Sequence, residues 1–192
     1  MIAIIKYNGG NVISVQNALK RLNADSIVTD DFDLIKNADK VIFPGVGEAS
    51  STMKLLRDKG LDKLIPTLQQ PVLGICLGMQ LMCGSNEEGN TEGMGIFDIK
   101  VKKFPPKDLV PHMGWNTLSE CQSPVFSGIE AEDDLYFVHS YYCELSEHTT
   151  SVCDYILPFS ASLQKNNFYA TQFHPEKSGK VGNEILNNFL KL

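Results

Sequence analysis

The stretch PVLGICLGMQL at residues 71–81 decides the fold of this chain. Its first half is short and nearly all apolar, which is typical of a strand buried in a parallel sheet. Its second half, from Gly78 onward, has the composition of a helix start. Between them lies Cys76 in the pattern Gly-x-Cys-x-Gly, the cysteine form of a nucleophile elbow. The stretch therefore predicts a strand–cysteine–helix turn in an α/β protein.

The spacing of the two glycines around the cysteine has a physical reason. A tight strand-to-helix turn strains the backbone at its centre, and side chains two positions away would collide with neighbouring elements, so Gly74 and Gly78 fit it. The turn lifts the Cys76 thiol clear of the sheet and places it at a helix N-terminus, which favours the thiolate. The Leu77 amide N–H would then face an oxyanion formed there. A buried cysteine in a glycine-containing turn is the equally simple alternative.

The sequence before the elbow alternates strand-like and helix-like segments. Alternation of this kind implies βαβ units and a parallel sheet. Strands are expected at 2–6, 26–29, 40–43 (ended by Pro44) and 71–75, and helices at 12–22, 49–59 and 61–69.

The sequence after the elbow changes character, because strand-like runs follow one another with few helices between them. The runs lie at 95–104, 114–119, 135–145, 151–157 and 161–173, with loops at 84–95 and 104–112 and a final helix at 180–191. We expect an open, mostly parallel central sheet flanked by helices, with extra antiparallel strands in the C-terminal half. Neither loop is long enough to link domains, so residues 1–192 are expected to form a single domain.

Composition excludes several functional classes. The chain has 17 Lys and Arg against 23 Asp and Glu, a net charge of −6, which disfavours nucleic-acid and acidic-membrane partners. No apolar run approaches the roughly 20 residues of a membrane span, and the N-terminus lacks the basic region of a signal peptide. The 5 cysteines form no CxxC pair and no zinc-type spacing, so we expect no metal and a cytoplasmic protein.

A thiol nucleophile needs a base, and the chain has 4 histidines. We expect His148 to be solvated, and His112 and His139 to be structural or to line a site. His174 differs, because it follows a strand-like run and has Glu176 two residues later. A carboxylate bonded to one ring nitrogen leaves the other free to accept the thiol proton. Strand ends share one sheet edge in such folds, so this histidine and the elbow cysteine are expected to meet.

A third candidate site is Pro44-Gly45-Val46-Gly47, which directly follows a predicted strand. Two glycines around one residue let the backbone approach a ligand and turn its N–H groups toward it. A simple turn is the alternative, and a phosphate cradle is disfavoured because the lysine of a P-loop is missing.

Together, PGVG at 44–47, PVLGICLGMQL at 71–81 and QFHPEKS at 172–178 resemble the class I (triad-type) glutamine amidotransferases over essentially the whole chain. PHMGWN at 111–116 and YFVHSYY at 136–142 resemble one branch of that class, the glutaminase subunits of imidazole glycerol phosphate synthases. The resemblance implies that Cys76 attacks the carboxamide of L-glutamine, that His174 transfers the protons, and that Glu176 orients His174.

The resemblance also implies the surrounding site, without any cofactor. The oxyanion would be held by the Leu77 amide and by an N–H of Val46 or Gly47, in a loop that flips when the partner is occupied. The glutamine-binding residues would be Gly47, Gln80, Glu88 (with Glu87 as the alternative), Ser140 and Tyr141. The contacts at the partner interface and ammonia exit would be Met113, Trp115 and Lys177. The remaining cysteines are expected to be core or near-surface filler: Cys83, Cys121, Cys143 and Cys153.

The implied partner is a (β/α)8-barrel cyclase in a heterodimer. It would use the ammonia to make imidazole glycerol phosphate and aminoimidazole carboxamide ribonucleotide in histidine biosynthesis. A glutaminase domain uses the entire chain, so the acceptor site is expected on that separate subunit.

Two alternatives stay open. Lys6, in KYNGGN at 6–11, stands where family members commonly carry an acidic or small polar residue. It keeps open an amidotransferase subunit that serves amidation of surface-polysaccharide sugars. A non-catalytic binding protein on the same fold is disfavoured, because cysteine, histidine and glutamate are all present.

Overall fold

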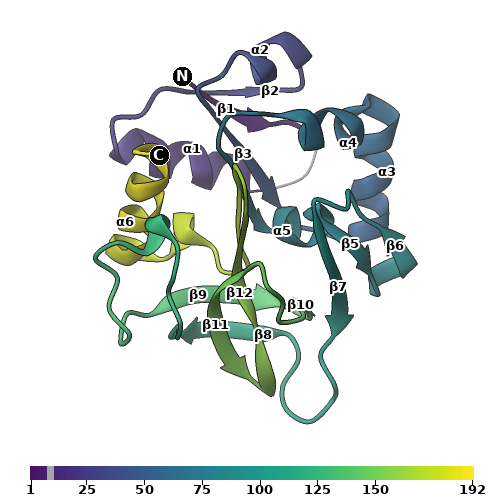
Figure 1. The fold of residues 1–192 in the computed structure, drawn as a ribbon, viewed down its shortest axis with the longest axis vertical. Helices are drawn as coiled ribbons and strands as arrows, with labels where there is room; N and C mark the ends of the chain where they lie inside the picture. Colours follow the sequence, from purple (N-terminus) through teal and green to yellow (C-terminus); the bar gives the residue numbers. More distant parts are fainter. Residues whose placement is uncertain (8–10) are drawn as a thin grey trace.

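The computed structural model describes residues 1–7 and 11–192. Its centre is a parallel sheet in the order β2-β1-β3-β4-β13 (Figure 1). These strands are β1 (Ile2–Ile5), β2 (Ser26–Thr29), β3 (Lys40–Gly45), β4 (Val72–Cys76) and β13 (Phe168–Thr171).

Helices cover both faces of the parallel sheet. One face packs against α1 (Val12–Arg21) and α6 (Gly179–Leu190). The other packs against α2 (Phe32–Lys36), α3 (Ala49–Lys59), α4 (Leu61–Leu64) and α5 (Leu77–Met82). Side chains alternate along β1, so that Ile4 belongs to the first core while Ala3 and Ile5 belong to the second. Burial on both faces explains why these strands are apolar throughout.

Beyond β13 the sheet continues through strands that follow Cys76 in the sequence, most of them in the C-terminal half, and all antiparallel pairs of the sheet lie in this part. The order is β13-β12-β10-β7-β5-β6, with β11 paired to β12 and only β5 and β7 parallel. The strands are β5 (Cys83–Asn86), β6 (Thr91–Glu92), β7 (Phe97–Lys103), β10 (Tyr141–Cys143), β11 (Thr149–Tyr155) and β12 (Leu157–Lys165). The expected fold class is confirmed.

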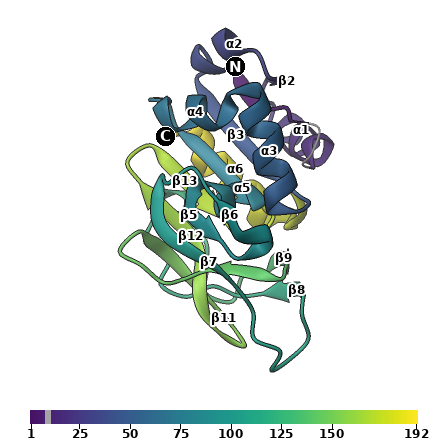
Figure 2. The ribbon, with the colours of Figure 1, turned by 90° about the vertical axis from the view of Figure 1, so that its right-hand side faces the viewer.

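A separate antiparallel ribbon pairs β8 (His112–Asn116) with β9 (Leu135–His139) and lies at the end of the molecule away from α2 (Figures 1 and 2). Single 3-10 turns complete the chain at η1 (Ile65–Thr67), η2 (Glu88–Asn90), η3 (Pro124–Phe126) and η4 (Pro175–Lys177). Among the described residues, no helix is long and apolar enough to cross a membrane.

Two expected boundaries move because of prolines. The helix expected over 61–69 is α-helical only to Leu64, where Pro66 has no N–H to continue the ladder. Strand β3 runs through Pro44 instead of ending there. Its ladder with β1 has already ended at Ile42, so Pro44 has a strand neighbour on the β4 side only.

Three expected segments divide differently. The run 161–173 contains the turn between β12 and β13, at Asn166 with φ 54°. The run 135–145 breaks at Ser140, because β9 pairs with β8 while β10 pairs with β7. The expected loop 84–95 contains β5 and β6, whose polar residues pair through the backbone. Short α2 is an addition that the periodicity did not predict.

The register of the parallel strands positions the site. Gly45 of β3 lies opposite Cys76 of β4, and Ile75 lies opposite Thr171 of β13. The loop after β3, the elbow after β4 and the segment after β13 therefore leave the sheet at one edge.

Candidate active site

Cys76 occupies a strained turn between β4 and α5. Its φ and ψ are 53° and −109°, a conformation that residues with a side chain rarely adopt. A Cβ at Gly78 would lie 2.1 Å from the Phe43 carbonyl oxygen, and one at Gly74 would lie 2.7 Å from Met82 Sδ. The backbone contact makes glycine necessary at Gly78, while a side chain at Gly74 would force Met82 to shift and would crowd the Gly78 backbone at 3.1 Å.

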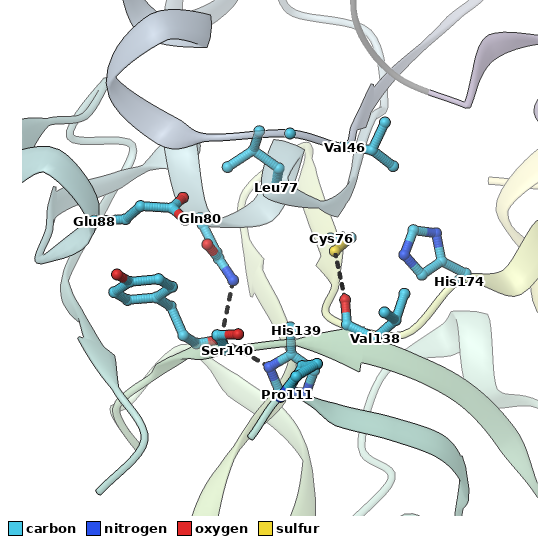
Figure 3. Close-up of a pocket in the computed structure, with 12 residues that line it drawn as sticks. Val46, Cys76, Leu77, Gln80, Glu88, Pro111, Val138, His139, Ser140 and His174 are labelled. Atoms are coloured by element: carbon cyan, nitrogen blue, oxygen red, sulfur yellow. Dashed lines mark hydrogen bonds between the residues drawn. The ribbon is translucent and has the colours of Figure 1, made fainter. Parts of the chain in front are cut away.

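His174 is held rigidly beside this turn. Its Nδ1 lies 2.8 Å from Glu176 Oε1 and donates a hydrogen bond to the carboxylate. Its backbone N–H donates to the Tyr136 carbonyl at 2.9 Å, and its carbonyl accepts from the Ser178 hydroxyl at 2.7 Å. The imidazole Nε2 is buried and has no hydrogen-bond partner among the described residues. That nitrogen is available to a group in the cavity that it lines with Cys76 (Figure 3).

The electrostatics favour a protonated His174 once the Cys76 sulfur is a thiolate. Burial lowers the pKa of His174, but the neighbouring Cys76 sulfur and the Glu176 carboxylate outweigh burial and raise it to about 10. An imidazolium of this kind is stable when the sulfur beside it is a thiolate. The arrangement suits transfer of the thiol proton to His174.

The loop after β3 packs directly on the elbow. A Cβ at Gly45 would lie 2.3 Å from the Gly78 backbone nitrogen. The buried Tyr7 hydroxyl donates to the Pro44 carbonyl at 2.7 Å and so ties the loop to the end of β1. Burial raises the pKa of Tyr7, and the Val46 backbone N–H partly offsets this effect. The predicted oxyanion residues all line the cavity: Val46, Gly47 and Leu77.

The cavity has a volume of about 320 Å³, and every residue predicted to bind glutamine lines it: Gly47, Gln80, Glu88, Ser140 and Tyr141. Of the two candidate glutamates, Glu88 lines the cavity and its Oε2 accepts the Ala49 N–H at 2.8 Å. Glu87 accepts the Lys103 N–H at 2.8 Å instead and is not among the lining residues. Burial raises the pKa of Glu88, although the hydrogen bond from the Ala49 N–H acts to lower it.

The two histidines expected to be structural or to line a site form a buried pair, and His139 of this pair lines the cavity. His139 Nδ1 donates to the Tyr141 carbonyl at 2.7 Å, so its Nε2 accepts from His112 Nδ1 at 3.1 Å. Burial lowers their pKa values to about 4 for His112 and about 3 for His139, which keeps both neutral. Pro111 and Val138 also line the cavity. Both residues fall within the PHMGWN and YFVHSYY strings, although the sequence does not identify either of them as a site residue. His148, expected to be solvated, is half-buried beside Phe97, with ring centroids 5.9 Å apart.

The predicted interface residues form one exposed cluster on and beside the β8–β9 ribbon. Met113 is 67% exposed and Trp115 56% exposed. The Trp115 ring packs edge-on against Tyr136 with centroids 5.7 Å apart, and Lys177 Nζ lies 5.8 Å from the centre of the Tyr136 ring. The lone tryptophan is therefore a surface residue and not part of the core.

Asn11, the last residue of the KYNGGN segment, lies close to Glu176. Asn11 Nδ2 lies 3.5 Å from Glu176 Oε1, and Lys6 is exposed. The middle of KYNGGN, residues 8–10, lies outside the described residues.

The other cysteines are mostly buried. Cys83, Cys143 and Cys153 are buried and Cys121 is exposed, with Cys83 Sγ 3.6 Å from Cys143 Sγ. Among residues 1–7 and 11–192, no group of three or more His, Cys, Asp or Glu side chains is placed to hold a metal ion.

Known proteins resemble this chain over its full length. The imidazole glycerol phosphate synthase subunit HisH of Bacteroides fragilis (strain YCH46) is 58% identical over 194 residues, which cover 100% of this chain and 99% of the relative. HisH of Pasteurella multocida (strain Pm70) is 47% identical over 192 residues, which cover 99% and 97%.

Solved structures show the same fold at low sequence identity. A crystal structure of a glutamine amidotransferase matches with a TM-score of 0.76 at 18% identity, over 100% of this chain and 98% of the other. PurLQS from Thermotoga maritima matches with a TM-score of 0.72 at 14% identity, over 99% and 97%.

The family model described as class-I glutamine amidotransferase matches residues 4–192. The expected family is therefore confirmed, both by this match and by the two relatives. The chain belongs to the class-I glutamine amidotransferases.

Proposed function

We propose that this chain is the glutaminase subunit of an imidazole glycerol phosphate synthase in histidine biosynthesis. It hydrolyses L-glutamine to glutamate and ammonia, and the ammonia passes to a cyclase subunit. The full-length relatives named above support the pathway. The observation that carries the chemistry is the buried Nε2 of His174, which has no hydrogen-bond partner within residues 1–7 and 11–192 and faces the cavity that His174 lines with Cys76.

The reaction follows from the roles of three residues. Cys76 gives its proton to His174 Nε2, and its sulfur attacks the side-chain carboxamide carbon of glutamine. The carbon–nitrogen bond then breaks while His174 returns the proton to the leaving ammonia, which leaves a γ-glutamyl thioester. His174 next takes a proton from the water that hydrolyses the thioester. Glu176 holds the imidazole with Nε2 toward the sulfur throughout.

The cavity supplies the remaining contacts. The Leu77 N–H and an N–H of the Val46–Gly47 loop stabilise the oxyanion formed at the carboxamide. The α-amino and α-carboxylate groups of glutamine bind farther along the cavity, near Gln80 and Glu88, with Ser140 and Tyr141 beside them. The half-buried Glu88 carboxylate has no ion pair in the part of the chain that the structure describes, which suits binding of an ammonium group.

The partner is a (β/α)8-barrel cyclase, which forms a heterodimer with this chain in the cytoplasm. Residues 1–192 act as one glutaminase domain. The exposed cluster of Met113, Trp115 and Lys177 contacts the cyclase, near the exit for ammonia. An aromatic ring held by a neighbouring ring and a cation is a common anchor in protein interfaces.

The test is to mix the purified chain with a histidine-pathway cyclase and its nucleotide substrate, and to measure glutamate formation. We expect the nucleotide-loaded cyclase to increase glutaminase activity, and Cys76→Ala to abolish the activity while still binding the cyclase. Glutamate production by Cys76→Ala would contradict the mechanism. A normal chain that gains no activity from this cyclase would favour the amidation of surface-polysaccharide sugars.

A further inference from the structure

We propose that Gln172 is a further catalytic residue, whose side-chain amide donates a hydrogen bond to the reacting sulfur of Cys76. This proposal rests on the proposed glutaminase function. Gln172 Nε2 lies 3.6 Å from Cys76 Sγ, and the residue is fully buried. It lies beyond the last residue of β13, and its backbone N–H donates to the Ala161 carbonyl at 2.8 Å, which fixes its position against β12.

The orientation of the Gln172 amide follows from a chain of hydrogen bonds. The Glu88 backbone N–H donates to Asn86 Oδ1 at 2.8 Å, so the Asn86 amide nitrogen must point the other way. That nitrogen donates to Gln80 Oε1 at 3.2 Å. Each amide in the chain thereby sets the direction of the next.

The chain of hydrogen bonds continues to the Cys76 sulfur. Gln80 Nε2 donates to Gln172 Oε1 and to the Tyr141 carbonyl, each at 3.0 Å. Because Gln172 Oε1 accepts from Gln80, the Gln172 NH2 group faces Cys76. A flip of either glutamine would bring two like groups together, which is costly in a buried network.

The chemistry gives this hydrogen bond a role in the reaction. Cys76 Sγ also lies 3.8 Å from the Val138 carbonyl oxygen, which accepts the thiol hydrogen before the proton moves to His174. Once the sulfur is a thiolate, it has only acceptor capacity, and a charge-assisted bond from the Gln172 N–H becomes stronger. Gln172 exchanges no proton. It favours the thiolate both before attack and when the thioester breaks and the sulfur leaves.

The same chain of hydrogen bonds also links the substrate end of the cavity to the nucleophile. Gln80 lines the cavity, whereas Asn86 and Gln172 lie behind it. Glutamine bound near Gln80 would therefore polarise the same amides that reach the sulfur.

The test compares Gln172→Met, which removes the donor, with Gln172→Glu, which keeps the acceptor for Gln80 but offers the sulfur no N–H. Alkylation of Cys76 by iodoacetamide is followed at a series of pH values by mass spectrometry of the Cys76 peptide. We expect the midpoint for Gln172→Met to rise by about one pH unit, with kcat for glutamine about tenfold lower and KM little changed. Gln172→Glu should raise the midpoint further.

Thr171→Val is the matched control, because Thr171 is a buried polar neighbour whose hydroxyl donates to the Phe173 carbonyl at 3.1 Å and not to Cys76. We expect it to leave the midpoint unchanged. An unchanged midpoint in the Gln172 variants, or an equal shift in Thr171→Val, would overturn the proposal. In the unaltered chain, the side-chain amide protons of Gln172 should shift in NMR spectra through the same midpoint, and absence of that shift overturns it too.

Alkylation needs neither glutamine nor the cyclase. Failure of the proposed function, seen as missing glutaminase activity in the unaltered complex, is therefore distinguishable from failure of the Gln172 proposal.

Discussion

At the residue scale, the proposed mechanism depends on which nitrogen of His174 carries the proton. The Glu176 carboxylate can only accept from Nδ1, so it leaves Nε2 of the neutral imidazole as the base. The buried Glu176 Oε2 has no partner in the described structure, and so a single oxygen makes this bond.

We predict that Glu176→Gln lowers kcat by about a hundredfold or more, with a small change in KM. The amide can donate to Nδ1, which places the imidazole proton on Nε2 and removes the base. Steady-state glutamate formation in the cyclase complex measures this. Glu184→Gln, an exposed change on α6, is the control. Equal activity in the two variants would contradict the orienting role.

A second residue-scale prediction concerns the pKa of His174. Burial lowers it, and the Cys76 sulfur is the largest of the groups that raise it to about 10. Cys76→Ala should therefore lower the pKa of His174, because burial remains while the sulfur is lost. NMR titration of the imidazole, assigned with His174→Gln, measures it. The same midpoint with and without the sulfur would show that the two side chains do not interact.

At the element scale, helix α3 begins beside the oxyanion loop and is capped by Glu48. The carboxylate accepts the backbone N–H groups of Ser50 at 3.0 Å and Ser51 at 2.7 Å. The bond from Ser51 is the largest cause that lowers the pKa of Glu48 from 4.5 to about 2. Because Glu48 directly follows Gly47, this cap fixes the end of the Val46–Gly47 loop.

We predict that Glu48→Ala lowers the free energy of unfolding by about 1 kcal/mol at neutral pH. A lowered folded-state pKa means that the stabilisation is present above the ordinary pKa and is lost as pH falls from 4.5 to about 2. Urea unfolding across that range should show the two curves converging at low pH. A difference that stays constant with pH would contradict capping by the carboxylate.

At the scale of the whole molecule, the catalytic cavity and the exposed cluster of Met113, Trp115 and Lys177 share the β8–β9 ribbon. His139 of β9 lines the cavity, while Trp115 of β8 is 56% exposed. A cyclase bound to this ribbon would therefore contact the element that carries one wall of the glutamine site.

We predict that Trp115→Ala weakens binding of the cyclase by at least about tenfold, as expected for a central aromatic anchor. Isothermal titration calorimetry measures this, and alkylation of Cys76 by iodoacetamide should be unchanged. Leu34→Ala, at a 38% exposed position on α2, is the control. Helix α2 lies at the opposite end of the molecule from the ribbon (Figure 1). Equal affinities for the two variants would place the interface elsewhere.

Much of the fold could be predicted because its signals are local. The elbow needs two glycines within two residues of Cys76, and the alternation of β1, α1 and β2 follows from periodicity over a few residues. The division of 161–173 into β12 and β13 was not predicted. Only the short polar stretch QKNN at 164–167 marks the turn at Asn166, and its first two residues still belong to β12. Strands β5 and β6 were missed because their polar sequence forms strands only through tertiary pairing, of β5 with β7 and of β6 with β5.

The sequence by itself determined the family, through the motifs at 44–47, 71–81 and 172–178, and it put the proposed nucleophile Cys76 and the proposed base His174 each at the end of a predicted strand. Only the tertiary structure decided between Glu88 and Glu87, since adjacent side chains point to different neighbours. It alone brought the Gln172 amide to Cys76, from 96 positions away. Contacts of that range depend on strand order and register, which put β13 next to β4, and no local pattern specifies them.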